Sequence, residues 1–225
     1  MERIVRSSYF NVTVLGDFSP TTITPRWLFQ ENFISKADLE AAKINLIHPD
    51  ASQFSLDGFQ FQVLRNTFQI TADDERYTPI LKDLSINIFT ALDRTPITAF
   101  GINYNTHFSA LSEDDWHQIG HALTPKDVWN KCFKKSGMKT IVIEGENPLA
   151  SQDHNGGYIH FKVEPSPLIK HGIYVQLNNH FNINKESSLL DNTNYLTDIF
   201  KTHWNTVTTD SRDKSKIISE MEIKK

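Results

Sequence analysis

The segment that constrains the fold most is the stretch from Ile97 to Phe108, in which apolar and polar side chains alternate. Successive side chains of a β-strand point to opposite faces, so this alternation predicts a strand that is buried on one side. The apolar face holds Phe100, Ile102 and Tyr104, and the polar face holds Asn103, Asn105 and His107. We therefore expect one side of this strand in a core and the other side outside it.

Similar strand patterns recur along the chain and predict an antiparallel sheet. They cover residues 9–15, 43–47, 53–55, 59–64, 68–70, 139–144, 158–164 and 172–182. Asp57 and Gly58 form a turn signal between two of these strands. The polar positions of the predicted strands include Gln60, Gln62, His160, Lys162, Gln176, Asn178 and His180. Because asparagine prefers turns to strands, a sheet face that holds several asparagines is expected to be specialised.

Helical periodicity is strongest in residues 76–92 and 193–208, where apolar side chains recur three and four positions apart. Shorter helices are expected over residues 26–32, 113–123 and 125–133. The last of these is predicted from a Thr-Pro pair, which is typical of an N-cap and a first helical turn. The strands and helices together predict an α+β fold, with an antiparallel sheet or sheets covered on one face by helices.

The chain is expected to form a single α+β domain over residues 1–209. An internal similarity leaves open an arrangement of two similar α/β halves, residues 43–110 and 139–209. The similar phrases are GIN followed by NTHF, which ends at Phe108, and GIY followed by NNHF, which ends at Phe181. Residues 210–225 are rich in charged side chains, so we expect a frayed tail or a helix that a partner binds.

Charge and cysteine content bear on the compartment and the partners. The net charge of −4 disfavours a general binder of phosphate backbones, although it leaves room for a local basic patch. Cys132 is the only cysteine, so neither a disulfide within the chain nor a cysteine-based zinc site can form. Charges interrupt the first residues, and no run of about 18 apolar residues occurs. We therefore expect a cytoplasmic protein that is neither secreted nor membrane-spanning.

The sequence contains no reaction-specific motif, and we assign it no catalytic residue and no cofactor. A glycine-rich phosphate loop and a GxSxG elbow are both missing. His117 and His121 have the spacing of two metal ligands on a helix, but the HQIGH sequence lacks the glutamate base of a metalloprotease. His107, His160 and His180 would form a different metal site only if their strands converge.

These features favour a non-catalytic interaction or scaffold subunit over an enzyme. Amide and imidazole side chains offer donors and acceptors to a protein partner or to a second copy of the chain. The expected binding residues are Asn103, Asn105, His107, Gln176, Asn178 and His180, with the C-terminal helix as a second candidate surface. Two alternatives stay open. One is a histidine-rich metal-dependent hydrolase or nuclease, and the other is a single-stranded nucleic-acid binding module, which the net charge disfavours.

Several phrases of the sequence resemble those of uncharacterised bacterial proteins of similar length. The phrases are TPRWL, RYTPILKDL, TPITAFGINYNTHF, WHQIGHALTPKDVW, YIHFKVEPS and VQLNNHFNI, and together they span almost the whole chain. The resemblance implies a bacterial origin and a single domain, and it supplies no activity and no catalytic residue. Some families of this kind lie beside defence or restriction genes, so the resemblance also suggests membership of an antiphage assembly.

Overall fold

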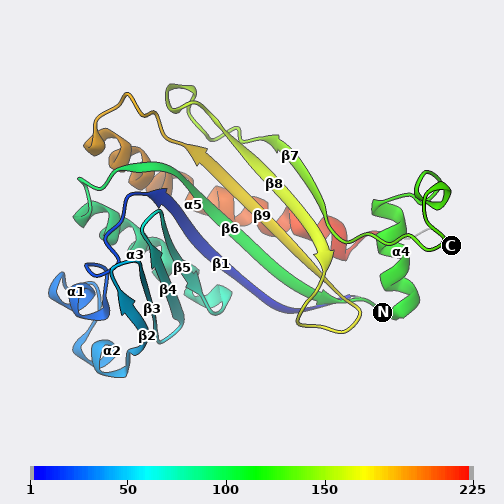
Figure 1. Cartoon of the computed structure of the whole chain (residues 1–225), viewed down its shortest axis with the longest axis horizontal. Coiled ribbons are helices and arrows are strands. Elements are labelled where there is room, and N and C mark those ends of the chain that lie inside the picture. Colours follow the sequence, from blue (N-terminus) through cyan, green and yellow to red (C-terminus); the bar gives the residue numbers. More distant parts are fainter. Residues whose placement is uncertain (1–2, 223–225) are drawn as a thin grey trace.

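The computed structural model describes residues 3–222. Within that range the strands form one antiparallel sheet of nine strands, in the order β2-β3-β4-β5-β1-β6-β9-β8-β7 (Figure 1). The strands are β1 Ile4–Gly16, β2 Lys43–His48, β3 Ala51–Leu56, β4 Phe59–Leu64, β5 Thr67–Ala72, β6 Ile97–Ser109, β7 Ile141–Glu146, β8 Gly157–Pro165 and β9 Gly172–Asn182. The predicted α+β fold with an antiparallel sheet is confirmed.

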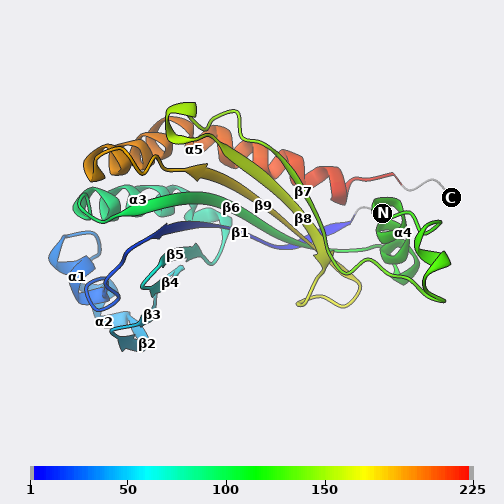
Figure 2. The ribbon, with the colours of Figure 1, turned by 45° about the horizontal axis from the view of Figure 1, so that its top comes forward.

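Two long helices lie side by side on one face of this sheet. They are α3, Thr78–Ala91, and α5, Leu189–Ser219, and the opposite face has no long helix over it (Figure 2). The shorter elements are α1 Pro25–Gln30, α2 Lys36–Ala41, α4 Glu113–Leu123 and the 3-10 turns Glu75–Tyr77, Trp129–Lys131 and Gln152–His154. None of the helices in the described range is long and apolar enough to cross a membrane.

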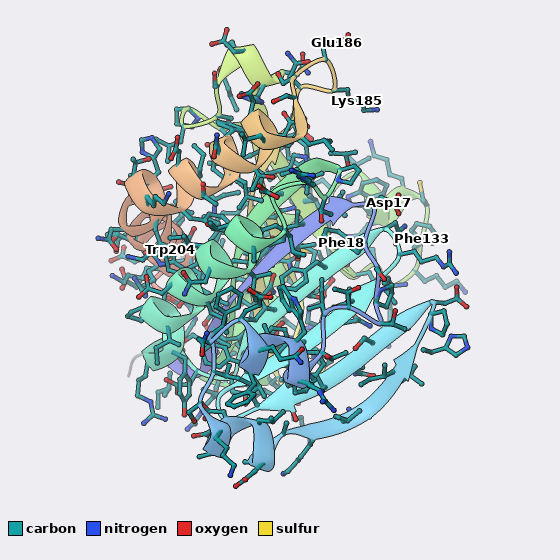
Figure 3. All side chains as sticks on the ribbon, turned by 90° about the vertical axis from the view of Figure 1, so that its left-hand side faces the viewer. Asp17, Phe18, Phe133, Lys185, Glu186 and Trp204 are labelled. Atoms are coloured by element: carbon teal, nitrogen blue, oxygen red, sulfur yellow. The ribbon has the colours of Figure 1, made fainter. Side chains whose placement is uncertain are left out.

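The core lies between the sheet and the two long helices, and aromatic side chains dominate it. Phe54 stacks on Phe61 with ring centroids 4.6 Å apart, and Phe100 stacks on Phe181 at 4.9 Å. Trp204 of α5 is buried in this layer (Figure 3). Burial of large apolar side chains is the main favourable term in folding, so it decides which face of each strand points inward.

Helix α4 begins and ends at the residues predicted for it, and α3 begins at Thr78, after a 3-10 turn, instead of at residue 76. The buried stripe of α3 includes Leu81, Leu84 and Ile88, which recur at the predicted spacing. Ser112 caps α4 by accepting a hydrogen bond from the backbone N–H of Asp115. Local sequence signals were thus sufficient to locate both helices.

The helix predicted over residues 125–133 does not form, and only the 3-10 turn Trp129–Lys131 is present there. Short helices are stable mainly when they bury an apolar face. Val128, Trp129 and Phe133 are all exposed, so a continued helix would bury nothing. The Thr-Pro pair alone was an insufficient signal, and this prediction was wrong.

Residues 210–219, for which a frayed tail or a partner-bound helix was expected, continue the last long helix of this chain. Helix α5 continues without interruption to Ser219. Its extension buries Ser211, Ser215 and Ile218. Small residues facing the sheet let the helix lie close to it, whereas Asp213 and Lys216 are exposed on its outer side. The part of the expected tail from residue 223 onward lies outside the described residues.

The chain topology repeats, although the repeat does not follow the expected boundaries. Strand β1 is followed by β2 to β5, whose last strand pairs with β1, and then by α3. Strand β6 is followed by β7 to β9, whose last strand pairs with β6, and then by α5. The two topological units are therefore residues 4–91 and 97–219, not 43–110 and 139–209. The similar phrases in β6 and β9 both belong to the second unit, so they do not mark the repeat.

Candidate functional site

A row of polar side chains, one from each strand, crosses the face of the sheet that α3 and α5 leave open. Successive cross-strand partners define this polar row as Glu144, His160, Asn178, Asn103, Asn11, Thr71, Gln60, Ser55 and Lys43, from β7 to β2. Neighbouring strands lie about 4.8 Å apart, so the row spans roughly 38 Å. The sheet thus presents one long polar surface built from both topological units.

All six predicted binding residues lie on this open face. Asn103 and Asn178 are direct partners within the polar row. The other four, Asn105, His107, Gln176 and His180, stand an even number of residues from them on the same two strands, so they share the face. The alternation in the sequence was sufficient to place these side chains together, but it could not indicate which of them are accessible.

Three of the predicted residues are buried although no helix covers them. Asn103, Asn105 and His107 are 7%, 1% and 3% exposed, respectively. Larger side chains of the neighbouring strands shield them, among them Tyr174, whose hydroxyl donates a hydrogen bond to Oδ1 of Asn105 at 2.6 Å. Gln176 donates to the same oxygen at 3.1 Å. These three residues therefore form the floor of the face, whereas Gln176, Asn178 and His180 remain half-buried.

The central floor joins the two topological units. Nδ2 of Asn103 in β6 donates a hydrogen bond to Oδ1 of Asn11 in β1 at 2.7 Å. Two amide atoms beside this pair, Nδ2 of Asn105 and Oδ1 of Asn178, are shielded and have no hydrogen-bond partner among the described residues. A buried polar atom without a partner costs on the order of 1–3 kcal/mol. The floor thus keeps one unsatisfied donor and one unsatisfied acceptor near the centre of the sheet.

The accessible part of the open face lies over β2 to β5, where a hollow of about 740 Å³ forms between the strands and α2. Four glutamines line it, and we call this site the glutamine hollow: Gln53, Gln60, Gln62 and Gln69. Gln53, Gln60 and Gln62 are exposed, and Nε2 of Gln60 donates to Oδ1 of Asp73 at 2.9 Å. The sequence marked Gln60 and Gln62 as polar-face positions, and tertiary structure makes them the accessible ones.

Aromatic and imidazole rings cover the other end of the face. The ring of Tyr158 in β8 lies 4.3 Å from the ring of His180 and 4.3 Å from that of His160. The ring of His107 stacks on Tyr174 at 4.6 Å, and Nδ1 of His107 lies 2.9 Å from the hydroxyl of Ser166. Stacking supports these side chains where no helix does.

Burial sets the protonation of these rings. It lowers the pKa of His107, against the opposing charge of Glu164, and it lowers the pKa of His180, against a hydrogen bond with Asn182. Burial also raises the pKa of Tyr158 and of Tyr174. Two imidazoles are therefore neutral near pH 7 and two phenols stay protonated, so these four rings can form hydrogen bonds but carry no charge.

Two carboxylates also lie on this face. Oε2 of Glu144 in β7 lies 2.7 Å from Nε2 of His160, and Oε1 of Glu164 lies 2.9 Å from Nζ of Lys162. Hydrogen bonds from Lys162 and Thr140 outweigh the effect of burial and lower the pKa of Glu164. Both carboxylates have cationic or imidazole partners, so they lie at the rim of the face as local pairs.

Several residues of the site were missed by the sequence reasoning. They are Tyr9, Asn11, Gln53, Gln69, Tyr158 and Tyr174. Each occupies an alternating position of a strand that the sequence did predict, so period-two counting extended to those strands would have found them. Nothing in the sequence indicated that Tyr174 covers Asn105, because this contact depends on β9 lying next to β6 in the sheet.

The proposed metal ligands do not form a cluster. His117 and His121 have ring centroids 6.3 Å apart on α4, and His160 and His180 flank Tyr158. Within residues 3–222, no group of three or more histidine, cysteine, aspartate or glutamate side chains is arranged to hold a metal ion. The geometry therefore gives the metal-hydrolase alternative no support.

Comparison of the sequence with models of known protein families and with curated proteins finds no match.

Proposed function

We propose that this chain is a non-catalytic interaction subunit that holds an extended segment of a protein partner against the open face of its sheet. The proposal rests on the glutamine hollow of about 740 Å³, to which β3 and β4 contribute exposed amide side chains and β5 contributes the half-buried Gln69. Lys43, Ser55, Gln60 and Thr71 of the polar row line the hollow, so a bound segment can lie across β2 to β5.

The chemistry of the face suits a peptide backbone. Each glutamine side chain offers both donors and an acceptor, which matches the alternating C=O and N–H groups of an extended chain. The four glutamines are uncharged, and Asp38, Asp57, Asp73 and Lys43 add charged groups to the lining of the hollow. Such a surface selects partners that form hydrogen bonds with its amide groups. A partner that leaves these amides without hydrogen bonds binds with lower affinity.

The partner is either another protein or a second copy of this chain. The edge strands β2 and β7 expose Ile44, Leu46, Val142 and Ile143, so each edge adds apolar contact beside the polar face. The exposed thiol of Cys132 is compatible with a reducing compartment, and we place the protein in the cytoplasm.

Site-directed photo-crosslinking in the producing cell tests the proposal. A photoreactive residue is introduced at Gln62 in the glutamine hollow, and in a separate variant at Lys201, an exposed position on α5. We expect a discrete crosslinked product from Gln62 and none from Lys201. A product with twice the mass of the chain identifies a second copy, and any other mass identifies a different protein.

The double variant Gln53→Ala, Gln62→Ala provides the matched loss-of-binding test. Both side chains are exposed, so the fold is expected to persist with an unchanged unfolding midpoint. The association seen with the parent chain should weaken roughly tenfold, since each hydrogen bond contributes about 0.5–1.5 kcal/mol. Equal crosslinking from both positions, or undiminished association of the double variant, would contradict binding at this face.

A further inference from the structure

A second surface lies at the end of the molecule away from the glutamine hollow, in the segment between α4 and β7 (Figure 1). Residues 126–139 contain five lysines and one acidic residue, Asp127. The lysines are Lys126, Lys131, Lys134, Lys135 and Lys139. This segment therefore carries a formal charge of +4, the five positive charges less one negative, in a chain whose net charge is −4. Such local segregation of charge indicates an anionic partner.

These lysines have no ion-pair partner among the described residues. Some lysines elsewhere pair with close carboxylates, as Lys162 does with Glu164 at 2.9 Å and Lys214 with Asp210 at 2.6 Å. In the segment, four of the five lysines are exposed and Lys126 is partly buried. Their charges are therefore available to a ligand.

Aromatic side chains are interleaved with the lysines. Trp129 is 46% exposed and Phe133 is 59% exposed, and Val128 beside them is 63% exposed. Large aromatic rings normally gain stability by burial, so their exposure among cations needs a reason. The absence of a helix in this segment leaves these rings accessible.

Two adjoining hollows lie beside the segment, with volumes of about 590 and 400 Å³. Residues Lys126, Lys135, Ser136, Gly137 and Met138 line both. Trp129 and Phe133 line the larger hollow, and Trp116 and His121 line the smaller. Burial, followed by the positive charge of Lys126, lowers the pKa of His121. Each hollow thus combines aromatic surface with lysine.

We infer that residues 116–139 form a binding site for single-stranded nucleic acid, with lysines contacting phosphates and aromatic rings stacking on bases. Single strands fit because their bases are free to enter the hollows, whereas the bases of a duplex are stacked and paired. The aromatic lining favours a nucleic acid over an acidic peptide, which would leave the rings without planar partners. The site is separate from the open face, so the test of this inference does not depend on the test of the proposed function.

Fluorescence anisotropy of the full chain with a labelled oligothymidylate of about 12 nucleotides is the direct test. Each lysine–phosphate contact is expected to change log K by roughly 0.7 per decade of salt, which gives a slope of about −2 to −3.5 for three to five contacts. Binding should therefore weaken between roughly 15- and 130-fold when salt rises from about 50 to 200 mM. No binding at the lower salt concentration overturns the inference.

Paired variants locate the site. Lys134→Glu with Lys135→Glu should abolish most of the binding, whereas Lys185→Glu with Lys201→Glu makes the same charge change on other exposed lysines and should reduce it only slightly. Lys185 lies in the connection between β9 and α5, at the opposite end of the long axis (Figures 1 and 3). Equal losses from the two pairs overturn the site assignment. Circular dichroism checks that each variant is folded.

The contribution of stacking is measured with Phe133→Ala, an exposed side chain whose removal leaves the core intact. We expect roughly tenfold weaker oligonucleotide binding, because stacking on a single aromatic ring is of that order. Unchanged oligonucleotide binding by Phe133→Ala overturns base recognition in favour of simple charge attraction. Displacement of the oligonucleotide by polyglutamate at equal charge concentration leads to the same conclusion. Binding to phosphatidylserine vesicles without binding to the oligonucleotide overturns the nucleic-acid assignment in favour of a membrane surface.

Discussion

Arg3 and Asp115 form a two-pronged ion pair that connects the first strand to helix α4. Nε and Nη2 of Arg3 donate to the two carboxylate oxygens of Asp115 at 2.9 and 2.8 Å. Nη1 of Arg3 donates to the backbone carbonyls of Ser219 and Met221, at the end of α5. The two side chains are only 7% and 13% exposed. One guanidinium thus ties together three segments that are far apart in the sequence.

Replacement of Arg3 should therefore be costly. Arg3→Ala leaves a largely buried carboxylate and two carbonyls without their donor, and we expect a loss of about 3–5 kcal/mol in the free energy of unfolding. Arg3→Lys should recover little, because an ammonium group cannot reproduce the two-pronged geometry. Urea unfolding measures both variants. Arg26→Lys, at an exposed position, serves as the control, and a loss in Arg3→Ala no larger than the control's would contradict this account.

The stability of the protein should fall as the pH drops below about 6.5. Burial lowers the pKa values of His107 and His180 in the folded state, so the unfolded chain binds protons more readily. The stabilisation is thus complete above the unfolded pKa and is lost as the pH falls toward the folded pKa. Urea midpoints at several pH values measure this dependence. His180→Gln should make the stability less dependent on pH, whereas Gln62→Ala, which changes an exposed side chain that does not titrate, should leave the pH dependence unchanged.

Glu75 anchors a cluster beneath α5, and its neutralisation should lower the pKa of Tyr104. Oε1 of Glu75 accepts a hydrogen bond from the Tyr104 hydroxyl at 2.7 Å, and Oε2 accepts from Nε of Arg212 at 2.6 Å. Burial, then the hydrogen bond and charge of Glu75, raises the pKa of Tyr104 to about 12. Ultraviolet titration of Glu75→Gln should show this late-ionising tyrosine moving toward pH 10. The exposed control Glu186→Gln should show no change.

A raised tyrosine pKa also predicts how stability responds to alkali. The folded state holds the Tyr104 proton more tightly than the unfolded chain, so its stabilisation is complete below pH 10 and is lost as the pH rises toward about 12. Glu75→Gln should reduce this alkaline dependence along with the pKa. An unchanged titration would show that burial alone sets the pKa.

Gly58 should not tolerate a side chain. Its φ is +77°, and a Cβ there would lie 2.5 Å from the ring of Tyr77. Gly58→Ala is expected to destabilise the fold by at least about 1–2 kcal/mol from backbone strain, with the steric conflict in addition. Gly120→Ala in α4 is the matched control, because a Cβ meets nothing within 4 Å and helix propensity favours alanine. In thermal unfolding, Gly58→Ala should lower the midpoint temperature and Gly120→Ala should leave it unchanged or raise it.

Local sequence patterns were sufficient to locate most strands and helices and to distinguish the two faces of the sheet. Period-two alternation placed Asn103 and Asn178 on a polar face, and three- and four-residue spacing located α3, because both patterns depend only on backbone geometry. The same local rules overpredicted a helix after Pro125, where no surface was available to bury its apolar side chains.

Packing between distant segments of the folded chain sets which polar residues are accessible and which segments meet. Strand order brings Tyr174 over Asn105, which buries that amide, and the position of α2 beside β3 and β4 leaves Gln53 and Gln62 open to a partner. Burial depends on neighbours across the sheet, and Arg3 finds Asp115 only once the chain has folded. Such long-range contacts leave no periodic signal in the sequence, because their energy is gained only after distant segments have come together.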